Sequence, residues 1–177
     1  MKNTALLVVD VQNALVLAKP FAAEEVIGNI KKLIKACREN GVEVIYIQHE
    51  DAAGGELEPN SEGWKIYKEI YPESGETVIN KHYNSAFRET SLKEYLDSRE
   101  IKQLILTGMQ TEYCIDATCK VAFEHGFKLI IPEKTNTTFD NGSMLAEDLY
   151  KFYNFNIYNG RYGTVECVES TLERIKA

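Results

Sequence analysis

Short apolar segments alternate with amphipathic helical segments along most of this chain, and this alternation constrains its fold more than any other feature. The apolar segment Ala5–Val9 is followed by a helical pattern over about 24–39 and then by a second apolar segment, Val42–Ile47. Strands that alternate with helices in this way form parallel sheets covered on both faces. We therefore predict a three-layer α/β fold with a six-stranded parallel sheet, in a single domain of residues 1–177.

The other predicted elements continue the alternation. The remaining strands are predicted at Thr77–Asn80, Gln103–Thr107, Lys128–Ile131 and Phe155–Tyr158. The remaining helices are predicted at residues 91–98, where a capping-box pattern begins at Ser91, and at 114–125, about 143–153 and 168–175. A short helix carrying Trp64, Ile66, Tyr67 and Ile70 is predicted after a loop over residues 51–61.

Charge and cysteine content exclude several classes of function. The 20 basic and 27 acidic residues give a net charge of −7, and no basic run is present, so nucleic acids and anionic membranes are disfavoured as partners. No apolar run has the length of a membrane span, and the first four residues leave no room for a signal peptide, so we expect a cytoplasmic protein. The cysteines, at positions 37, 114, 119 and 167, contain no CxxC pair that would predict a zinc site or a disulfide framework.

Three chemically useful side chains follow predicted strands. Asp10 follows the first strand, Lys81 the third and Cys114 the fourth. In a parallel sheet the ligand crevice lies beyond the carboxyl ends of the strands, so these side chains are predicted to meet at one rim. Taken singly, an aspartate there is commonly a turn residue and a lysine is commonly solvated. Together, a carboxylate, an ammonium and a thiol are the parts needed to generate a nucleophile.

Cys114 allows two interpretations. It falls in or near the first turn of a helix, where unpaired backbone N–H groups and the helix dipole favour a thiolate and lower a cysteine pKa. The alternative is a small buried hydrophobe, because free cysteine is among the most buried residue types.

Three segments carry motifs in a fixed order. Residues 8–13 read VVDVQN, residues 81–87 read KHYNSAF and residues 108–118 read GMQTEYCIDAT. They resemble the DxQ, KxxxSAF and GxxTExCVxxT segments of the isochorismatase-like cysteine hydrolases, with Leu15 where an aromatic residue is common. The resemblance extends from the first strand to the last helix and implies the Rossmann-like fold of that superfamily.

The resemblance implies a catalytic triad. Cys114 would be the nucleophile, Asp10 the general acid and base, and Lys81 the charge that holds both in their working ionisation states. The oxyanion would be bound by the backbone N–H groups of Gln110 and Cys114, beside a cis Met109–Gln110 peptide. The reaction would then be cleavage of a C–N bond in a small amide or ureido substrate through a thioester.

Several further properties follow from the resemblance. The family's substrates include amides, ureido compounds and a vinyl ether, and a neighbouring subunit often completes the pocket, so we expect a small-molecule substrate and a homo-oligomer, a dimer or tetramer. A mostly apolar pocket suits such a substrate. The residues predicted to bind it are Gln12, Trp64, Tyr83, Phe87, Tyr113 and Phe139.

No metal or other cofactor is predicted. Nicotinamidases of the superfamily place a metal-binding DxH after the second strand, where this chain reads IQHED over residues 47–51. Three adjacent residues do not easily converge on one ion, so His49, Glu50 and Asp51 are predicted to lie in a solvated loop. His82 is predicted to point away from Lys81, and His125 to sit at a helix end, so no histidine is predicted to act as a base.

Two rival functions remain open. An isochorismatase-type vinyl-ether hydrolase would use Asp10 to protonate its substrate and would need no thiol. A catalytically silent binding protein could keep the fold, although an intact triad disfavours it.

Overall fold

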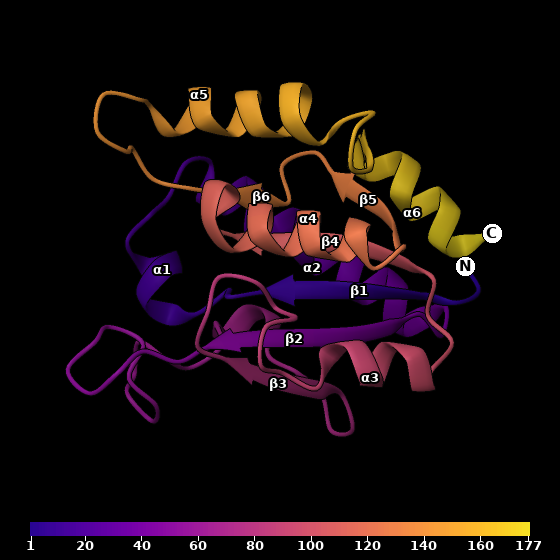
Figure 1. The fold of residues 1–177 in the computed structure, drawn as a ribbon, viewed down its shortest axis with the longest axis horizontal. Helices are drawn as coiled ribbons and strands as arrows, with labels where there is room; N and C mark the ends of the chain where they lie inside the picture. The colour runs from indigo at the N-terminus through magenta and orange to yellow at the C-terminus, as the bar shows by residue number, and fades with distance from the viewer.

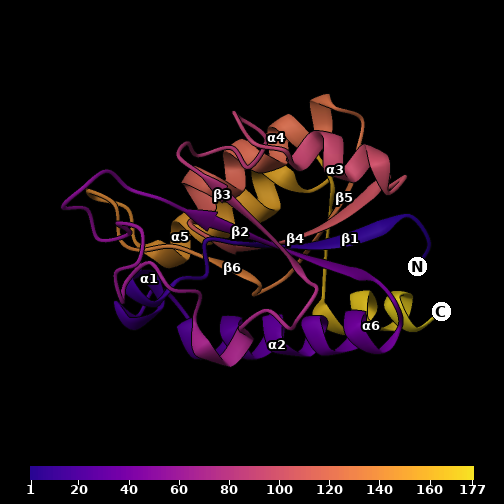
Figure 2. The same cartoon turned by 90° about the horizontal axis from the view of Figure 1, so that it is seen from below.

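The computed structural model describes residues 1–177 and contains one parallel sheet with helices on both faces (Figures 1 and 2). The strand order is β3-β2-β1-β4-β5-β7, and β6 pairs with β4 beyond the end of β5. The strands are β1 (Thr4–Val9), β2 (Glu43–His49), β3 (Thr77–Lys81), β4 (Gln103–Met109), β5 (Lys128–Pro132), β6 (Asn136–Thr137) and β7 (Thr164–Glu166).

The helices form two layers. Helices α2 (Ala23–Glu39) and α6 (Val168–Lys176) cover one face of the sheet, and α3 (Leu92–Ser98) and α4 (Asp116–Glu124) cover the other (Figure 2). The shorter elements are α1 (Asn13–Leu17), α5 (Ala146–Lys151), a 3₁₀ turn η1 (Lys68–Ile70), and two π-helical segments, η2 (Thr111–Ile115) and η3 (Phe152–Tyr158). None of the helices combines the length and the apolar composition that a membrane span requires.

The sheet separates two cores, and β1 contributes to both. Leu6 and Val8 belong to the core under α2 and α6, whereas Leu7 and Val9 belong to the core under α3 and α4. This alternation follows from the two-residue period of a strand. Every residue of β1 is buried, so the central strand is a fixed reference for the site built at its end.

The prediction of a three-layer α/β fold with a parallel sheet is confirmed, but the sheet has seven strands instead of six. The last predicted strand, Phe155–Tyr158, is wrong. These residues continue α5 as the helical segment η3, in which the Tyr158 hydroxyl donates a hydrogen bond to the Thr111 carbonyl at 2.7 Å. The edge strand is instead Thr164–Glu166, which pairs with β5.

Two local predictions also differ from the structure. Helix α3 starts at Leu92, but the Ser91 side chain makes no capping hydrogen bond, and Thr90 Oγ1 accepts from Leu92 N instead. The predicted short helix is reduced to η1, because Ile66 pairs as an antiparallel bridge with Gln12.

Close backbone contact fixes the ends of β1 and β4 relative to each other. Gly108 in β4 has a φ of +125°, and a Cβ there would lie 2.0 Å from the Val9 carbonyl oxygen. Only glycine accommodates both the conformation and the contact. Asp10 follows Val9 with a φ of 53°, and its N–H donates to the Ile47 carbonyl at 2.9 Å. The carboxyl ends of β1, β2 and β4 are therefore held in register where the predicted site residues lie.

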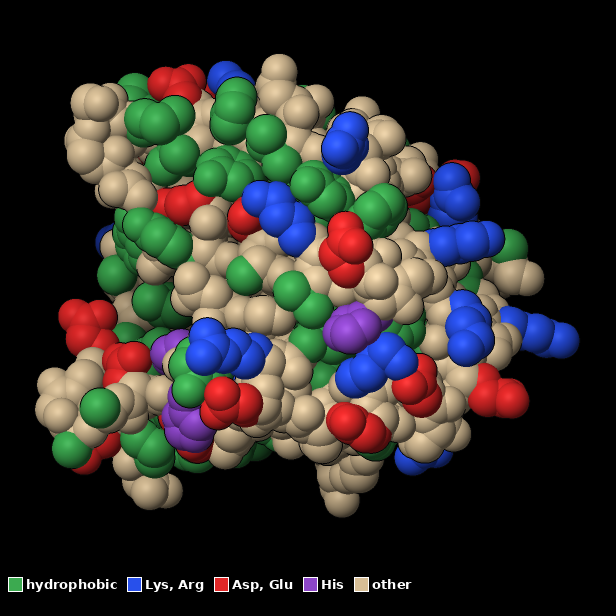
Figure 3. Space-filling view, in the orientation of Figure 1, with side chains coloured by type: hydrophobic (Ala, Val, Ile, Leu, Met, Phe, Trp, Pro, Cys, Tyr) green, Lys and Arg blue, Asp and Glu red, His purple; other side chains and the backbone are tan.

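One surface region is apolar. Hydrophobic side chains gather over α4, α5 and the segments next to α5 (Figure 3). The exposed members are Phe123, Met144, Leu145, Phe152 and Phe155. The chain termini lie at the end of the molecule opposite the carboxyl ends of the strands (Figure 1).

Candidate active site

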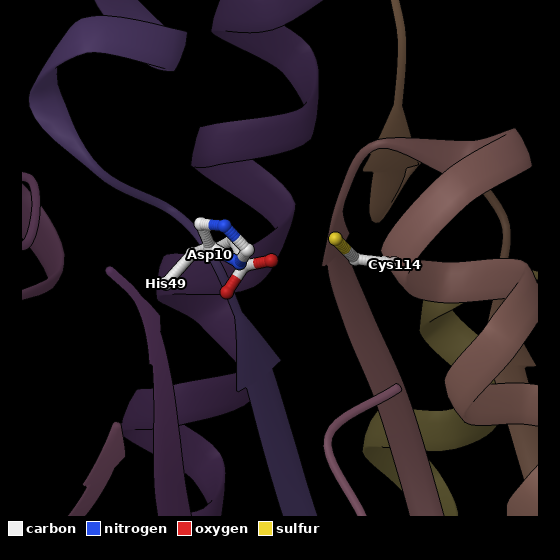
Figure 4. Close-up of side chains that lie close together, drawn as sticks. All are labelled: Asp10, His49 and Cys114. Carbon is white, nitrogen blue, oxygen red and sulfur yellow. The ribbon is translucent and has the colours of Figure 1, made fainter. Parts of the chain in front are cut away.

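Asp10, Lys81 and Cys114 meet at the carboxyl edge of the sheet. Asp10 follows β1, Lys81 ends β3, and Cys114 lies in η2, directly after β4. The Lys81 Nζ atom is 2.7 Å from Asp10 Oδ2 and 3.3 Å from Cys114 Sγ. Figure 4 shows the side chains of Asp10 and Cys114 facing each other from separate elements. The structure therefore brings the three residues of the predicted triad together.

Lys81 is the centre of this arrangement. Its side chain is fully buried, and its Nζ also lies 3.0 Å from the Tyr83 carbonyl oxygen and 3.0 Å from His49 Nδ1. Four surrounding acceptors hold the ammonium in one position. A buried charge requires such compensation.

Asp10 has the environment of a strong base. Its side chain is 2% exposed, and its Oδ1 atom has no hydrogen-bond partner. Burial raises the pKa of Asp10 above the ordinary value, and the nearby Lys81 ammonium opposes that increase. One carboxylate oxygen is therefore held by Lys81, while the other is free to accept a proton.

The surroundings of Cys114 favour a neutral thiol, not the thiolate of the first interpretation. Burial and the neighbouring Asp10 carboxylate raise the pKa of the Cys114 thiol to about 12, and the Lys81 ammonium offsets only part of the increase. Desolvation disfavours the charged thiolate and is the largest cause of the increase. The thiol is consequently neutral at rest and needs Asp10 to remove its proton during attack.

The raised pKa of Cys114 predicts how the free enzyme reacts with alkylating reagents. Below its pKa a thiol gains about tenfold in thiolate per pH unit, so alkylation of Cys114 by iodoacetamide should keep accelerating from about pH 7 to pH 9. Peptide mass spectrometry would follow Cys114, with the exposed Cys167 as a reactivity reference in the same sample. A plateau below about pH 8 would contradict the neutral-thiol assignment.

The predicted oxyanion-binding residues lie at the same edge. The Met109–Gln110 peptide is cis. Gln110 and Cys114 both line the pocket that contains Asp10.

His49 is a site residue that the sequence-based reasoning missed. It is the last residue of β2, pairs in register with Lys81, and has a side chain that is only 18% exposed, so the prediction of a solvated loop is wrong for this residue. Its Nδ1 faces Lys81 Nζ, and its Nε2 lies 3.4 Å from Asp51 Oδ1. Burial and the Lys81 charge lower the pKa of His49, which favours a neutral ring that accepts from Lys81 through Nδ1.

A cavity of about 200 Å³ opens above Cys114. Half of its lining is apolar and half is polar. The lining residues are Asp10, Leu15, His49, Asp51, Leu57, Asn84, Met109, Gln110, Tyr113 and Cys114. Of the predicted substrate-binding residues, only Tyr113 lines this cavity, and its hydroxyl accepts a hydrogen bond from Asn141 Nδ2 at 2.7 Å.

Gln12 has a structural role instead. Its side chain is fully buried, its Oε1 accepts from His49 N at 2.9 Å, and its Nε2 donates to the carbonyl oxygens of His49 and Trp64. Both side-chain N–H groups are used within the protein, and no part of the side chain is exposed to a substrate. Gln12 therefore fixes the end of β2, where His49 begins the pocket wall.

The remaining aromatic residues lie outside the cavity. Phe87 is buried in the core against Phe127, and Phe139 lines a separate depression. Tyr83 stacks under the Arg88 guanidinium, and Trp64 contributes its carbonyl oxygen to Gln12. Aromatic type alone could not separate pocket residues from core residues.

The site contains a possible ligand set for a metal ion, but Lys81 fills it. One ligand atom each from Asp10, His49 and Cys114 lie within 4.8 Å of one another, and these atom types suit zinc. The Lys81 Nζ atom, however, contacts all three residues at 2.7, 3.0 and 3.3 Å, respectively. The ammonium occupies the position that a cation would take, so the residues do not fit a metal.

Comparisons with known proteins identify the family and the fold. A family model described as an isochorismatase domain matches residues 4–147. An uncharacterized isochorismatase family protein of Bacillus subtilis is 34% identical over 97% of this chain and 99% of its own length. N-carbamoylsarcosine amidase of an Arthrobacter species is 29% identical over 89% of this chain and 65% of its own length. A crystal structure of an isochorismatase family protein superposes with a TM-score of 0.87 at 28% identity, covering 93% of this chain and 98% of that one.

Proposed function

Because this chain belongs to the isochorismatase family, we propose that its Asp10, Lys81 and Cys114 hydrolyse a C–N bond of a small amide or ureido substrate through a thioester. The protein is a hydrolase of C–N bonds, since amidase and amidohydrolase names recur among its relatives. The cysteine mechanism rests mainly on one observation, the Lys81 ammonium bridging the Asp10 carboxylate and the Cys114 sulfur.

Acylation would begin with proton transfer. Asp10 accepts the thiol proton as Cys114 Sγ attacks the substrate carbonyl carbon, and the N–H groups of Gln110 and Cys114 bind the oxyanion. The oxyanion then collapses, the C–N bond breaks, and Asp10 returns the proton to the leaving nitrogen. The Lys81 ammonium limits the accumulation of negative charge near Asp10.

Deacylation would reuse the same carboxylate. Asp10 removes a proton from water as the water oxygen attacks the thioester carbonyl. The C–S bond then breaks to release the acid, and Asp10 passes the proton to the departing sulfur, which restores the Cys114 thiol and the Asp10 carboxylate. The raised pKa of Asp10 suits both steps, because a catalytic group works best when its pKa approaches the operating pH.

A second candidate is supported by the same raised pKa. An Asp10 that holds its proton could protonate a vinyl ether, as an isochorismatase-type reaction requires. This route would leave Cys114 without a chemical role.

Ammonia release from a panel of small amides and ureido compounds tests the proposal. We expect at least one compound to be turned over by the wild type and not by Cys114→Ala. If the purified, folded enzyme releases ammonia from none of the panel while it cleaves a vinyl ether, the C–N proposal fails.

Activity is expected not to depend on a divalent metal. Because the Lys81 ammonium fills the space between Asp10, His49 and Cys114, dialysis against a chelator should leave the rate within about twofold of the starting value. Elemental analysis of the same sample should find zinc well below one atom per chain. Stoichiometric zinc whose removal and return switch activity off and on would contradict this prediction.

Self-association stays a prediction from the family resemblance. Light scattering of the purified protein would measure it directly.

A further inference from the structure

The charges around the pocket are unbalanced. Among the ten lining residues, Asp10 and Asp51 carry carboxylates, and no lysine or arginine is present. The buried Lys81 compensates Asp10 at 2.7 Å, whereas the ionisable partner of Asp51 is His49 and not a lysine or arginine. The Arg88 guanidinium is stacked over the Tyr83 ring at 3.7 Å and does not line the pocket.

Asp51 is held rigidly in the pocket wall. Its Oδ2 accepts from Leu57 N at 3.0 Å, and its own N–H donates to the Leu57 carbonyl at 3.0 Å. Gly55 packs so closely over the Asp51 side chain that a Cβ on Gly55 would lie 2.4 Å from Asp51 Cβ. The carboxylate is nevertheless 35% exposed. The loop from Asp51 to Leu57 therefore presents a fixed negative charge at the cavity.

His49 does not neutralise this charge. Its Nε2 lies 3.4 Å from Asp51 Oδ1, but burial and the Lys81 ammonium lower the pKa of His49 and favour a neutral ring at pH 7. An incoming anion would consequently meet the Asp51 carboxylate, whereas the one ammonium of the site has no exposed surface.

We infer that this pocket selects neutral or cationic small molecules over carboxylates and that Asp51 sets this selectivity. The inference rests on the proposed function only in identifying the pocket as the substrate site. It narrows the substrate class to amides or ureido compounds that carry no acid group near the scissile bond, and it favours those with an ammonium or N–H donor directed toward Asp51.

The charge preference can be measured without a known substrate, by labelling Cys114. We would measure the rate at which Cys114 is labelled by two methanethiosulfonates, the cationic trimethylammonioethyl reagent and the anionic sulfonatoethyl reagent. Mass spectrometry of the Cys114 peptide would follow each reaction. For each protein, the labelling rate with the cationic reagent is divided by the rate with the anionic reagent. This ratio is then divided by the same ratio measured for a small neutral thiol in the same buffer, which removes the difference in intrinsic reactivity between the two reagents. At low salt the wild-type ratio is expected to exceed the reference by about tenfold or more, because a cleft focuses the field of its charges.

Asp51→Asn keeps the shape and the acceptor for Leu57 N but removes the charge, so its ratio should fall by at least about fivefold. Glu56→Gln is the matched control, because it removes a charge from the same loop at an exposed residue outside the pocket, and its ratio should stay near the wild-type value. An uncharged methyl methanethiosulfonate should label all three proteins at similar rates if their pockets are intact. If Asp51→Asn does not fold, the wild-type protein alone still tests the inference. Its cation-to-anion labelling ratio must decline with added salt, because salt screens the charge of Asp51.

A wild-type ratio no larger than that of the reference thiol, an anion preference, or an unchanged ratio in a folded Asp51→Asn variant would overturn the inference. A turnover series of butyramide, β-alaninamide and succinamate gives a separate reading, with succinamate expected to be the poorest substrate. If no amide is turned over while the labelling ratio behaves as expected, the proposed function fails and the charge selectivity stands. If amides are turned over but the labelling ratio shows no cation preference, the charge selectivity fails and the proposed hydrolase function stands.

Discussion

Replacing Cys114 by alanine is expected to abolish turnover, with a loss of about 10⁴-fold or more, while the protein remains folded. Cys114 lines the pocket and is only partly buried against the core, so truncation to alanine is expected to leave the fold intact. Asp10→Asn should be comparably damaging, because the neutral thiol then has no base to remove its proton. Steady-state kinetics on the best amide of the panel, with circular dichroism to check folding, would measure both effects.

A double variant of Asp10 and Cys114 tests whether the two residues act together in one step or contribute to the rate independently. Because Asp10 acts on the proton of Cys114, Asp10→Asn combined with Cys114→Ala should be scarcely slower than either single variant. With a slow substrate, acid quenching should trap an acyl group on the Cys114 peptide as a mass increase. A vinyl-ether mechanism predicts a different pattern, in which Cys114→Ala retains much of its rate, Asp10→Asn is inactive and no adduct forms.

Replacing Lys81 by methionine is expected to cause the largest loss of stability, about 3–5 kcal/mol, because it leaves the Asp10 carboxylate buried without its counter-charge. Urea unfolding at pH 7 would measure the change in the free energy of unfolding. Lys120→Met is a suitable control, since Lys120 pairs with Asp116 at 2.7 Å with a side chain that is 41% exposed. Because solvent reaches the Lys120 ammonium, this pair should contribute less to stability than the fully buried Lys81–Asp10 pair.

The pH dependence of the Lys81→Met deficit has a definite sign. Without the ammonium, burial raises the pKa of Asp10 further above the 3.8 of an unperturbed aspartate. A raised folded-state pKa contributes stability that is present at low pH and lost as the pH rises through that pKa. The deficit relative to wild type should therefore be smallest near pH 4 and grow toward neutrality, and Asp10→Asn should relieve it at pH 7. A deficit that is equal at both pH values, or unrelieved by Asp10→Asn, would assign the loss to packing.

The positions of the triad residues could be predicted because they follow from local sequence. A strand that ends in Asp10, another that ends in Lys81 and a strand-to-helix turn before Cys114 each leave a pattern within a few residues. The common edge of a parallel sheet then brings them together without any knowledge of long-range contacts.

His49 and Asp51 could not be placed in this way. The β2 strand extends two residues beyond the predicted Ile47, because the Gln12 side chain and the Lys81 carbonyl hold its end through hydrogen bonds formed across the fold. Asp51 faces the pocket because its backbone pairs with Leu57, a contact with no local sequence signal. The sequence left the pKa of Cys114 open, since helix position is visible in the sequence but desolvation is not.

Helical and strand periods were likewise ambiguous near the end of the chain. Residues 155–158 read FNIY, which alternates like a strand, yet the buried Asn154 bonds with Asn136 and the Tyr158 hydroxyl bonds with the Thr111 carbonyl in a helical segment. Tertiary contacts decide the conformation of so short a pattern.

The closed loop between Asp51 and Leu57 can vary in sequence without displacing the catalytic residues. Its two ends are joined by one backbone hydrogen bond and by the bond from Leu57 N to the Asp51 carboxylate, whereas Asp10, Lys81 and Cys114 are positioned by the ends of β1, β3 and β4. Insertions or exchanges inside the loop can therefore alter the wall that a substrate meets without moving the reacting groups, because surface loops tolerate changes of length at little thermodynamic cost. Such changes would vary substrate preference while the chemistry stays constant. A laboratory library at residues 52, 53 and 56 would test this without replacing Gly54, which has a φ of +86°, or Gly55, which packs against Asp51.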